Sequence, residues 1–191
     1  HILRLRVESL SGSHDVLAAY LECVRWGLNL YFQFSGYSDI AIGFAMLLGF
    51  RIAENFNYPF LATNIGDFWR RWHISLSDWC RDYIYKLVLS VGRRPWLAVI
   101  ASMLILGVWH ELSFRYLVWG VYHGAGIAIW QGFQRVKPLL PGMDFAAGRY
   151  ITGAASWLLT MNFVVLSFAL TKEPDLAEGI RVIAKILFFW V

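Results

Sequence analysis

The sequence has little charge and almost no cysteine. Only 16% of its 191 residues are charged, whereas soluble domains usually have about a quarter. Two cysteines, Cys23 and Cys80, are too few and too far apart for a disulfide framework or a cysteine metal site. His110-Glu111 begins the HExxH pattern of zinc proteases, but Phe114 stands where the second histidine is required. Serine-hydrolase, P-loop and dinucleotide motifs are also missing, and we expect no metal site.

Large apolar side chains are what the sequence has in excess. Hydrophobic residues make up 58% of it, with ten Trp, nine Tyr and fourteen Phe, and the mean hydropathy is +0.50. A soluble chain of this size lacks the interior volume to bury them all, and aromatic side chains collect where hydrocarbon meets water. The net charge of +4 comes from basic residues between apolar stretches, which is typical of membrane proteins. We therefore expect membrane lipid, and no nucleic acid, as a partner.

The apolar stretches predict an all-α, multi-pass transmembrane helical bundle. About 20 apolar residues are needed to cross a bilayer. The candidate spans are residues 15–34, 96–110, 114–133, 151–170 and a last one from about residue 180, with 37–50 as a short or re-entrant span after Ser35-Gly36. We expect residues 1–191 to form one partial membrane-embedded domain. Because the chain begins at His1, without a signal peptide, and ends in an apolar run, we expect a fragment of a longer protein.

Residues 51–95 differ from the rest because seven of the seventeen basic residues lie there. Apolar residues recur there at three- and four-residue steps, which predicts an amphipathic interfacial or re-entrant helix: Ile65, Phe68, Trp72, Leu76, Trp79 and Tyr83. Thr63 or Asn64 is the expected N-cap, and Asp67 is spaced to pair with Arg70 or Arg71. Glu22 and Arg25 are expected to pair and to face protein. The basic residues place this segment on the cytoplasmic side.

His110 is the strongest candidate for chemistry because it ends an apolar segment. Ionisable residues at membrane depth are costly and indicate function by default, and histidine is the usual proton acceptor near neutral pH. Spacing alone leaves a second interpretation open, in which a helix-end histidine binds a neighbouring carbonyl.

Three further polar residues lie in apolar surroundings. His73 borders the apolar face of the predicted amphipathic helix, and periodicity favours a structural role for it. His123 lies between Gly120 and Gly124, whose spacing lets membrane helices approach closely, and is interpreted as a packing residue. Asp39 requires a partner, and either orients a substrate or joins two helices.

Three blocks of sequence together resemble the membrane-bound O-acyltransferase family, in particular its bacterial branch of alginate O-acetylases and teichoic acid D-alanyl transferases. The blocks are YFQFSGYSDIAIGFAMLLGFRIAENFNYPF over residues 31–60, NIGDFWRRWHISLSDWCRDYIY over 64–85, and GVWH at 107–110 followed by WGVYHG at 119–124. The resemblance covers about residues 15–135 and is to the C-terminal part of the family's proteins. Glu111-Leu112 departs from the family, which often has Gly-Ala after the histidine.

The resemblance implies roles for individual residues. His110 matches the family's essential histidine and is expected to be catalytic, and His73 matches its second histidine and is expected to assist. Trp109, Asp39, Arg70 and Arg71 are the expected substrate-binding residues.

The implied function is transfer of an acyl group, acetyl by preference, from a thioester donor to hydroxyls of an extracytoplasmic polysaccharide. The donor, acetyl-CoA or an acyl carrier protein, is a substrate, and no bound cofactor is expected. Other subunits of an envelope-modification complex are expected partners, and the bacterial inner membrane is the expected location. The alternatives are D-alanyl transfer to teichoic acid, and a non-enzymatic transporter or export-complex subunit.

Overall fold

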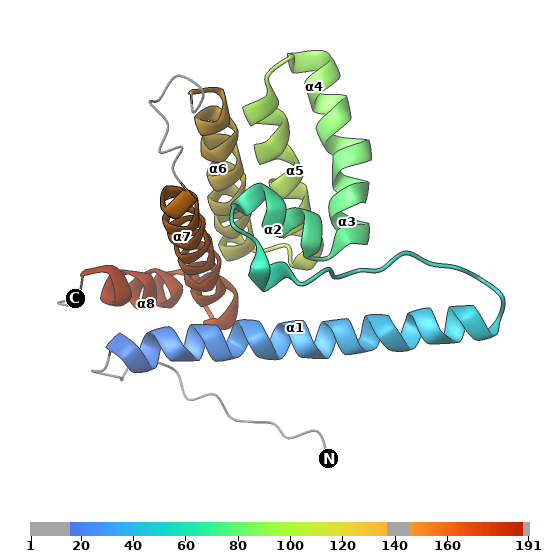
Figure 1. Cartoon of the computed structure of the whole chain (residues 1–191), viewed down its shortest axis with the longest axis horizontal. Helices are drawn as coiled ribbons and strands as arrows, with labels where there is room; N and C mark the ends of the chain where they lie inside the picture. The colour runs from blue at the N-terminus through green and yellow to red at the C-terminus, as the bar shows by residue number, and fades with distance from the viewer. Residues whose placement is uncertain (1–15, 137–145, 189–191) are drawn as a thin grey trace.

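The computed structural model describes residues 16–136 and 146–188, with side chains from residue 153 in the second range, and the regular structure of these residues is helical throughout (Figure 1). The long helix α1 (Val16–Leu47) lies across one side of the molecule. Helices α5 (Pro95–His110) and α6 (Phe114–Val136) form a hairpin that runs steeply to α1 in this view. Helices α7 (Ala146–Lys172) and α8 (Leu176–Phe188) follow, and α7 packs against both α1 and α6. The all-α prediction is confirmed.

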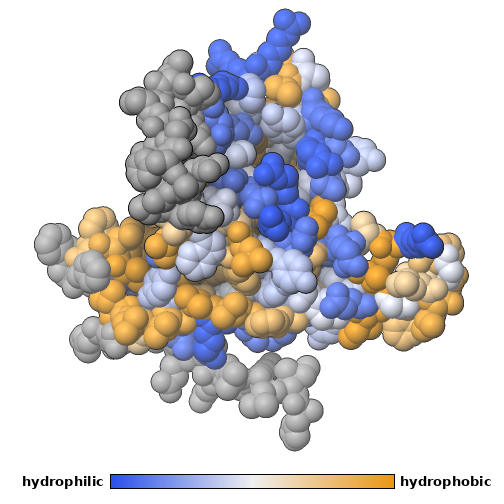
Figure 2. Space-filling model, viewed as in Figure 1, coloured by the Kyte–Doolittle hydropathy of each residue, from blue (hydrophilic) through white to orange (hydrophobic). Residues whose placement is uncertain are grey.

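One described helical segment, Gly153–Lys172 in α7, is long and apolar enough to cross a membrane, and Pro95–His110 is apolar but shorter. The predicted span 151–170 therefore has a counterpart in the structure, while several crossings remain a prediction. Hydrophobic side chains gather over α1, and hydrophilic ones over α2, α3 and α4, in the view of Figure 2.

The predicted break at Ser35-Gly36 is wrong, because α1 continues from Val16 to Leu47 without interruption. The hydroxyl of Ser35 donates to the carbonyl of Phe32, and that of Ser38 donates to the carbonyl of Phe34. Both hydroxyls are thus satisfied within the helix, which is how serine is tolerated inside apolar helices. The segments 15–34 and 37–50 form one helix rather than a span and a re-entrant segment.

The prediction of one amphipathic helix in 51–95 is also wrong. The segment contains the short η2 (Pro59–Leu61) and α2 (Ile65–Arg71), and then a continuous rod of α3 (Ile74–Trp79), the π-helical η3 (Cys80–Tyr85) and α4 (Lys86–Gly92). The break falls at His73, whose φ of 44° is left-handed. The backbone N–H of Ile74 donates to the carbonyl of Asn55 instead of to the preceding helical turn, so the helix cannot continue.

Local predictions in this segment are confirmed. Asn64 is the N-cap of α2 and accepts a hydrogen bond from the backbone N–H of Asp67 at 2.8 Å. Asp67 pairs with Arg71 at 2.8 Å and with Arg70 at 3.6 Å.

In α1, Glu22 and Arg25 pair at 2.6 Å as predicted, but Arg25 is exposed instead of facing protein.

The core is aromatic and is centred on α2. Phe68, Trp69 and the C-cap residue Trp72 are all buried. The Trp72 ring contacts Tyr31 of α1 and Phe168 of α7, and Trp69 meets α6. The apolar face of the predicted helix is thus buried in its first half. Its second half is exposed, with Trp79 at 47% and Tyr83 at 63% exposure.

Glycines set the close approach of α5 and α6. A Cβ atom on Gly120 would lie 2.5 Å from the backbone oxygen of Met103, and one on Gly124 would lie 3.0 Å from the Cα of Ile100. The predicted role of these two glycines in helix packing is confirmed. Because the contacting atoms belong to the backbone of α5, a side chain at either position has to separate the two helices.

We expect Gly120→Ala to destabilise the hairpin. Forcing a methyl group into a packed interface costs about 1–3 kcal/mol, so the full-length protein in detergent should unfold at a clearly lower temperature, measured by tryptophan fluorescence. Gly132→Ala is the matched control on the same helix, since nothing lies within 4 Å of its Cβ position. Equal unfolding temperatures for the two variants would contradict the tight α5–α6 contact.

Candidate active site

A cavity of about 140 Å³ lies where α1, α2, α6 and α7 converge near the end of α5. Its lining consists mostly of aromatic side chains, with a small number of polar groups. The lining residues are Trp26, Leu30, Phe34, Phe68, Trp69, Trp72, His110, Tyr116, Trp119, His123, Val164, Ser167, Phe168 and Thr171. An apolar pocket with a few polar groups is the usual form of a small-molecule site.

His110 lies at the edge of this cavity. It is the last residue of α5, and its side chain is exposed on one side while aromatic rings surround it on the other. The ring of Tyr116 stacks on it at 5.8 Å, Trp119 meets it edge-on at 5.8 Å, and the adjacent Trp109 lies at 5.0 Å. The predicted base therefore borders a cavity and is fixed in orientation by its neighbours.

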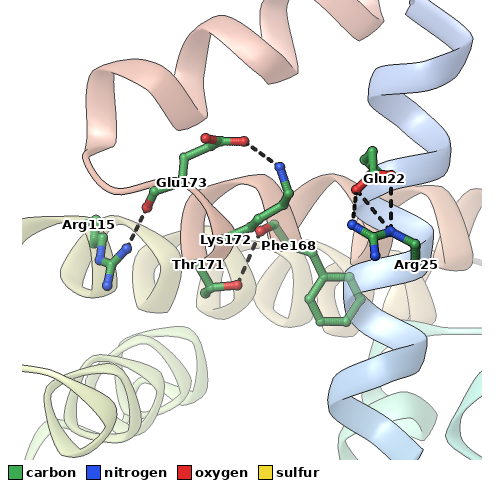
Figure 3. A network of polar contacts seen from close by, with 7 residues as sticks. All are labelled: Glu22, Arg25, Arg115, Phe168, Thr171, Lys172 and Glu173. Carbon is green, nitrogen blue, oxygen red and sulfur yellow. Dashed lines mark hydrogen bonds and ion pairs between the residues drawn. The ribbon is translucent and has the colours of Figure 1, made fainter. Parts of the chain in front are cut away.

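The turn that follows His110 is tied to the end of α7. Arg115 pairs with Glu111 at 2.5 Å and donates to the backbone oxygen of Glu173 at 2.5 Å. Figure 3 shows this second bond beside the ion pair of Lys172 with Glu173, whose side chains are 3% and 2% exposed. The carboxylate of Glu111, the residue that departs from the family pattern, thus makes a structural contact. Through Arg115, this contact holds the His110 turn against the end of α7, which lines the cavity.

His73 is buried beside the cavity but does not line it. Its ring lies 4.7 Å from Phe34, which lines the cavity, and 5.9 Å from Trp109, which precedes His110. Nδ1 lies 3.1 Å from Oδ1 of Asn55. Burial, with a smaller contribution from His110, lowers the pKa of His73 to about 4, so the ring is neutral near pH 7. The structure therefore brings the two predicted histidines into one neighbourhood.

His123 is a packing residue, as its sequence position suggested, and it also borders the cavity. It is 1% exposed, and its Nδ1 accepts a hydrogen bond from the indole nitrogen of Trp69 at 3.3 Å. Because an indole N–H can only donate, Nδ1 is occupied. This bond joins α6 to α2 inside the core.

The predicted substrate-binding residues lie outside the cavity lining. Trp109 is 61% exposed and touches both histidines. Asp39 is exposed on α1, and no side chain in the described part of the chain pairs with it. The Arg70 side chain is 65% exposed, and Arg71 donates to the backbone oxygen of Asn57. Their binding roles remain predictions.

The sequence analysis missed the contributions of α1 and α7 to the cavity. Trp26, Leu30 and Phe34 recur at four-residue steps, and Ser167, Phe168 and Thr171 occupy one face of α7. The indole nitrogen of Trp26 is buried and lacks a hydrogen-bond partner among the described residues. Helical periodicity was the available signal, but it could not show which two faces meet.

The polar groups in the cavity lining are two imidazoles, indole N–H groups and the hydroxyls of Tyr116, Ser167 and Thr171, in aromatic surroundings. Within residues 16–136 and 146–188, no group of three or more His, Cys, Asp or Glu side chains is arranged to hold a metal ion. A histidine beside an apolar pocket can take a proton from a hydroxyl held nearby. This arrangement suits acyl transfer without a metal ligand set.

The sequence of this chain is similar to a known protein family and to individual known proteins. Residues 8–171 match the sequence model of the membrane-bound O-acyltransferase family. A probable alginate O-acetylase of Pseudomonas fluorescens is 46% identical over 175 residues. The peptidoglycan O-acetyltransferase of Helicobacter pylori is 30% identical over 175 residues, and the teichoic acid D-alanyltransferase of Bacillus subtilis is 33% identical over 165.

These alignments cover most of this chain but only part of each relative. The P. fluorescens and H. pylori alignments cover 90% of this chain and 33% and 32% of the relatives, and the B. subtilis alignment covers 81% and 41%. The chain thus spans about a third of the length of the two O-acetylating relatives.

Proposed function

Because the chain belongs to the membrane-bound O-acyltransferase family, we propose that it forms the catalytic part of an enzyme that transfers acetyl from a thioester donor to a polysaccharide hydroxyl. The observation that carries this proposal is the position of His110, at the edge of an aromatic cavity and held by Tyr116 and Trp119. The acceptor is an extracytoplasmic glycan, and the donor is acetyl-CoA or an acyl carrier protein reached from the cytoplasm.

In the proposed reaction, His110 acts as the general base. It removes the proton from the acceptor hydroxyl as the oxygen attacks the thioester carbonyl. The tetrahedral intermediate then collapses, the carbon–sulfur bond breaks, and the thiolate takes the proton back from His110. The products are the acetyl ester and the free thiol, and His110 returns to its neutral form.

The size of the cavity supports a short acyl group. A cavity of about 150 Å³ is known to accommodate benzene, a molecule of about six heavy atoms. The cavity beside His110 is about 140 Å³ and is partly open, which gives room for an acetyl group. The O-acetylating relatives from P. fluorescens and H. pylori favour acetyl as well.

Deleting the gene in its native host tests the proposal. We expect ester-linked acetyl groups to disappear from one cell-envelope or secreted polysaccharide, as measured by mass spectrometry of purified glycans, and to return when the wild-type gene is restored. Loss of D-alanyl esters instead would assign the reaction to teichoic acid. Glycans with every ester group intact would contradict acyl transfer to a polysaccharide.

A further inference from the structure

A chain of hydrogen bonds with one consistent arrangement of protons connects α1 to His73. The amide oxygen of Asn55 accepts from the backbone N–H of Ser75 at 3.3 Å and from its hydroxyl at 2.9 Å. A backbone N–H can only donate, so this end of the Asn55 side chain has to be the oxygen. The orientation of the amide therefore follows from its partners.

The contacts of Nδ2, at the other end of the Asn55 amide, give the same orientation. The hydroxyl of Ser38 donates its proton to the carbonyl of Phe34 at 2.9 Å. Its oxygen is then free only to accept, and Nδ2 of Asn55 donates to it at 3.1 Å. Two independent contacts thus place the NH₂ group toward α1 and the oxygen toward His73.

This orientation decides which nitrogen of His73 carries the proton. Nδ1 lies 3.1 Å from the amide oxygen, which can only accept, so Nδ1 is the protonated nitrogen. In a neutral imidazole the other nitrogen, Nε2, then holds the lone pair. Nε2 is buried and has no hydrogen-bond partner among the described residues, in a side chain that is 8% exposed in total. Buried polar atoms without partners are rare and indicate a role.

We propose that Asn55 is a positioning residue for the acyl transfer: it fixes His73 as the Nδ1–H tautomer, so that Nε2 is a hydrogen-bond acceptor for the glycan that receives the acyl group. The inference rests on the proposed function. The left-handed backbone of His73 and the bond from the N–H of Ile74 to the carbonyl of Asn55 hold the ring in place. Phe34 and Trp109 pack against the ring, and because Nε2 is buried, one of them has to shift before a reactant can contact it.

The Nδ1–H tautomer limits the ways in which His73 can assist the reaction. A neutral ring that donates from Nδ1 to Asn55 has no proton on Nε2, so it cannot donate to the negative charge that develops on the carbonyl oxygen. It can accept a hydrogen bond from a second hydroxyl of the acceptor glycan and so orient the attacking hydroxyl, whose own proton goes to His110, toward the acyl carbon. This geometry therefore supports orientation of a reactant as the assisting role of His73.

The test uses the full-length enzyme with the variants Asn55→Ala and Asn55→Asp, and Asn57→Ala as the matched control. Asn57 lies in the same segment, its side chain is exposed, and it contacts Arg71 through backbone atoms that alanine retains. Asn55→Ala removes the acceptor that selects the tautomer, and we expect kcat to fall at least about tenfold at every pH, while Asn57→Ala remains like wild type.

The Asn55→Asp variant distinguishes a positioning role of Asn55 from a purely structural role. The carboxylate keeps an acceptor at Nδ1 but raises the pKa of His73, and the one other titratable group described as acting on this ring is His110. As the pH falls through the raised pKa, Nε2 becomes protonated and can no longer accept. We therefore expect activity near wild type at alkaline pH and an acidic loss of kcat that begins at higher pH than in wild type.

Nitrogen NMR of histidine-labelled wild-type protein reports the tautomer directly and does not depend on any variant. We expect Nδ1 of His73 to be protonated and Nε2 unprotonated, with His73→Asn identifying the signal. A protonated Nε2, or an Asn55→Ala enzyme with wild-type kcat, would overturn the inference. A wild-type enzyme without acyl transfer would instead contradict the proposed function, so the two failures are distinguishable.

Discussion

His110→Ala is expected to lower the rate constant of acyl transfer by about 10²–10⁴-fold, the usual contribution of a general base. Without the imidazole, the attacking hydroxyl loses the base that the proposed reaction assigns to it. The measurement is release of free thiol from an acetyl thioester in the presence of acceptor polysaccharide, with the full-length protein in detergent or proteoliposomes.

Leu112→Ala is the matched control for this experiment. Leu112 lies two residues beyond His110 in the same turn, and its side chain is 85% exposed. The pair of Glu111 with Arg115 remains in both variants, so the turn stays attached to α7. Both proteins should express and extract like wild type. A His110→Ala enzyme with undiminished thiol release would remove His110 from the reaction.

The parts of the structure that sequence reasoning predicted correctly depend on neighbours three or four residues apart. The Asn64 cap and the Asp67–Arg71 ion pair are contacts within a single helical turn. The glycines at 120 and 124 are one turn apart, so their common face is also set locally. Periodicity is sufficient for such features because the geometry of one helix determines them.

The parts it did not predict depend on contacts between distant segments. Asn55 and His73 are 18 residues apart, and the bond from the backbone N–H of Ile74 to the carbonyl of Asn55 breaks what the apolar pattern predicted as one helix. The cavity likewise combines Trp26 of α1 with Phe168 of α7. Periodicity describes each face separately, and only the tertiary arrangement shows that the faces meet around one imidazole.

A common feature of the site is that the turn after His110 and the ring of His73 are each held by groups outside the cavity lining. The turn after His110 is held by Glu111, Arg115 and the backbone carbonyl of Glu173, which follows α7. His73 is held by Asn55, itself bound to α1 through Ser38. Both supports join segments far apart in sequence. A cavity built in this way keeps its polar groups in place although its walls are mostly aromatic rings, which contribute few directional contacts.

The imidazole of His73 can be removed with little strain on the backbone that carries it, and this makes His73→Asn the second informative substitution. The residue has a φ of 44°, a left-handed conformation that costs most residues roughly 1–2 kcal/mol but that asparagine adopts readily. We expect His73→Asn to unfold near the wild-type temperature while kcat falls about 10²-fold. His73→Ala should lose activity and thermal stability together, because alanine retains the strain without a polar side chain.

Comparison of these two variants separates chemistry from folding at this position. If His73 served only to end α2 and begin α3, asparagine would replace it and transfer would continue at the wild-type rate. That result would exclude His73 from the reaction and would leave its buried Nε2 as an unpaired atom tolerated for structural reasons. If instead His73→Asn is stable and slow, the loss is chemical, since the left-handed junction and the bond from Ile74 to Asn55 are still in place.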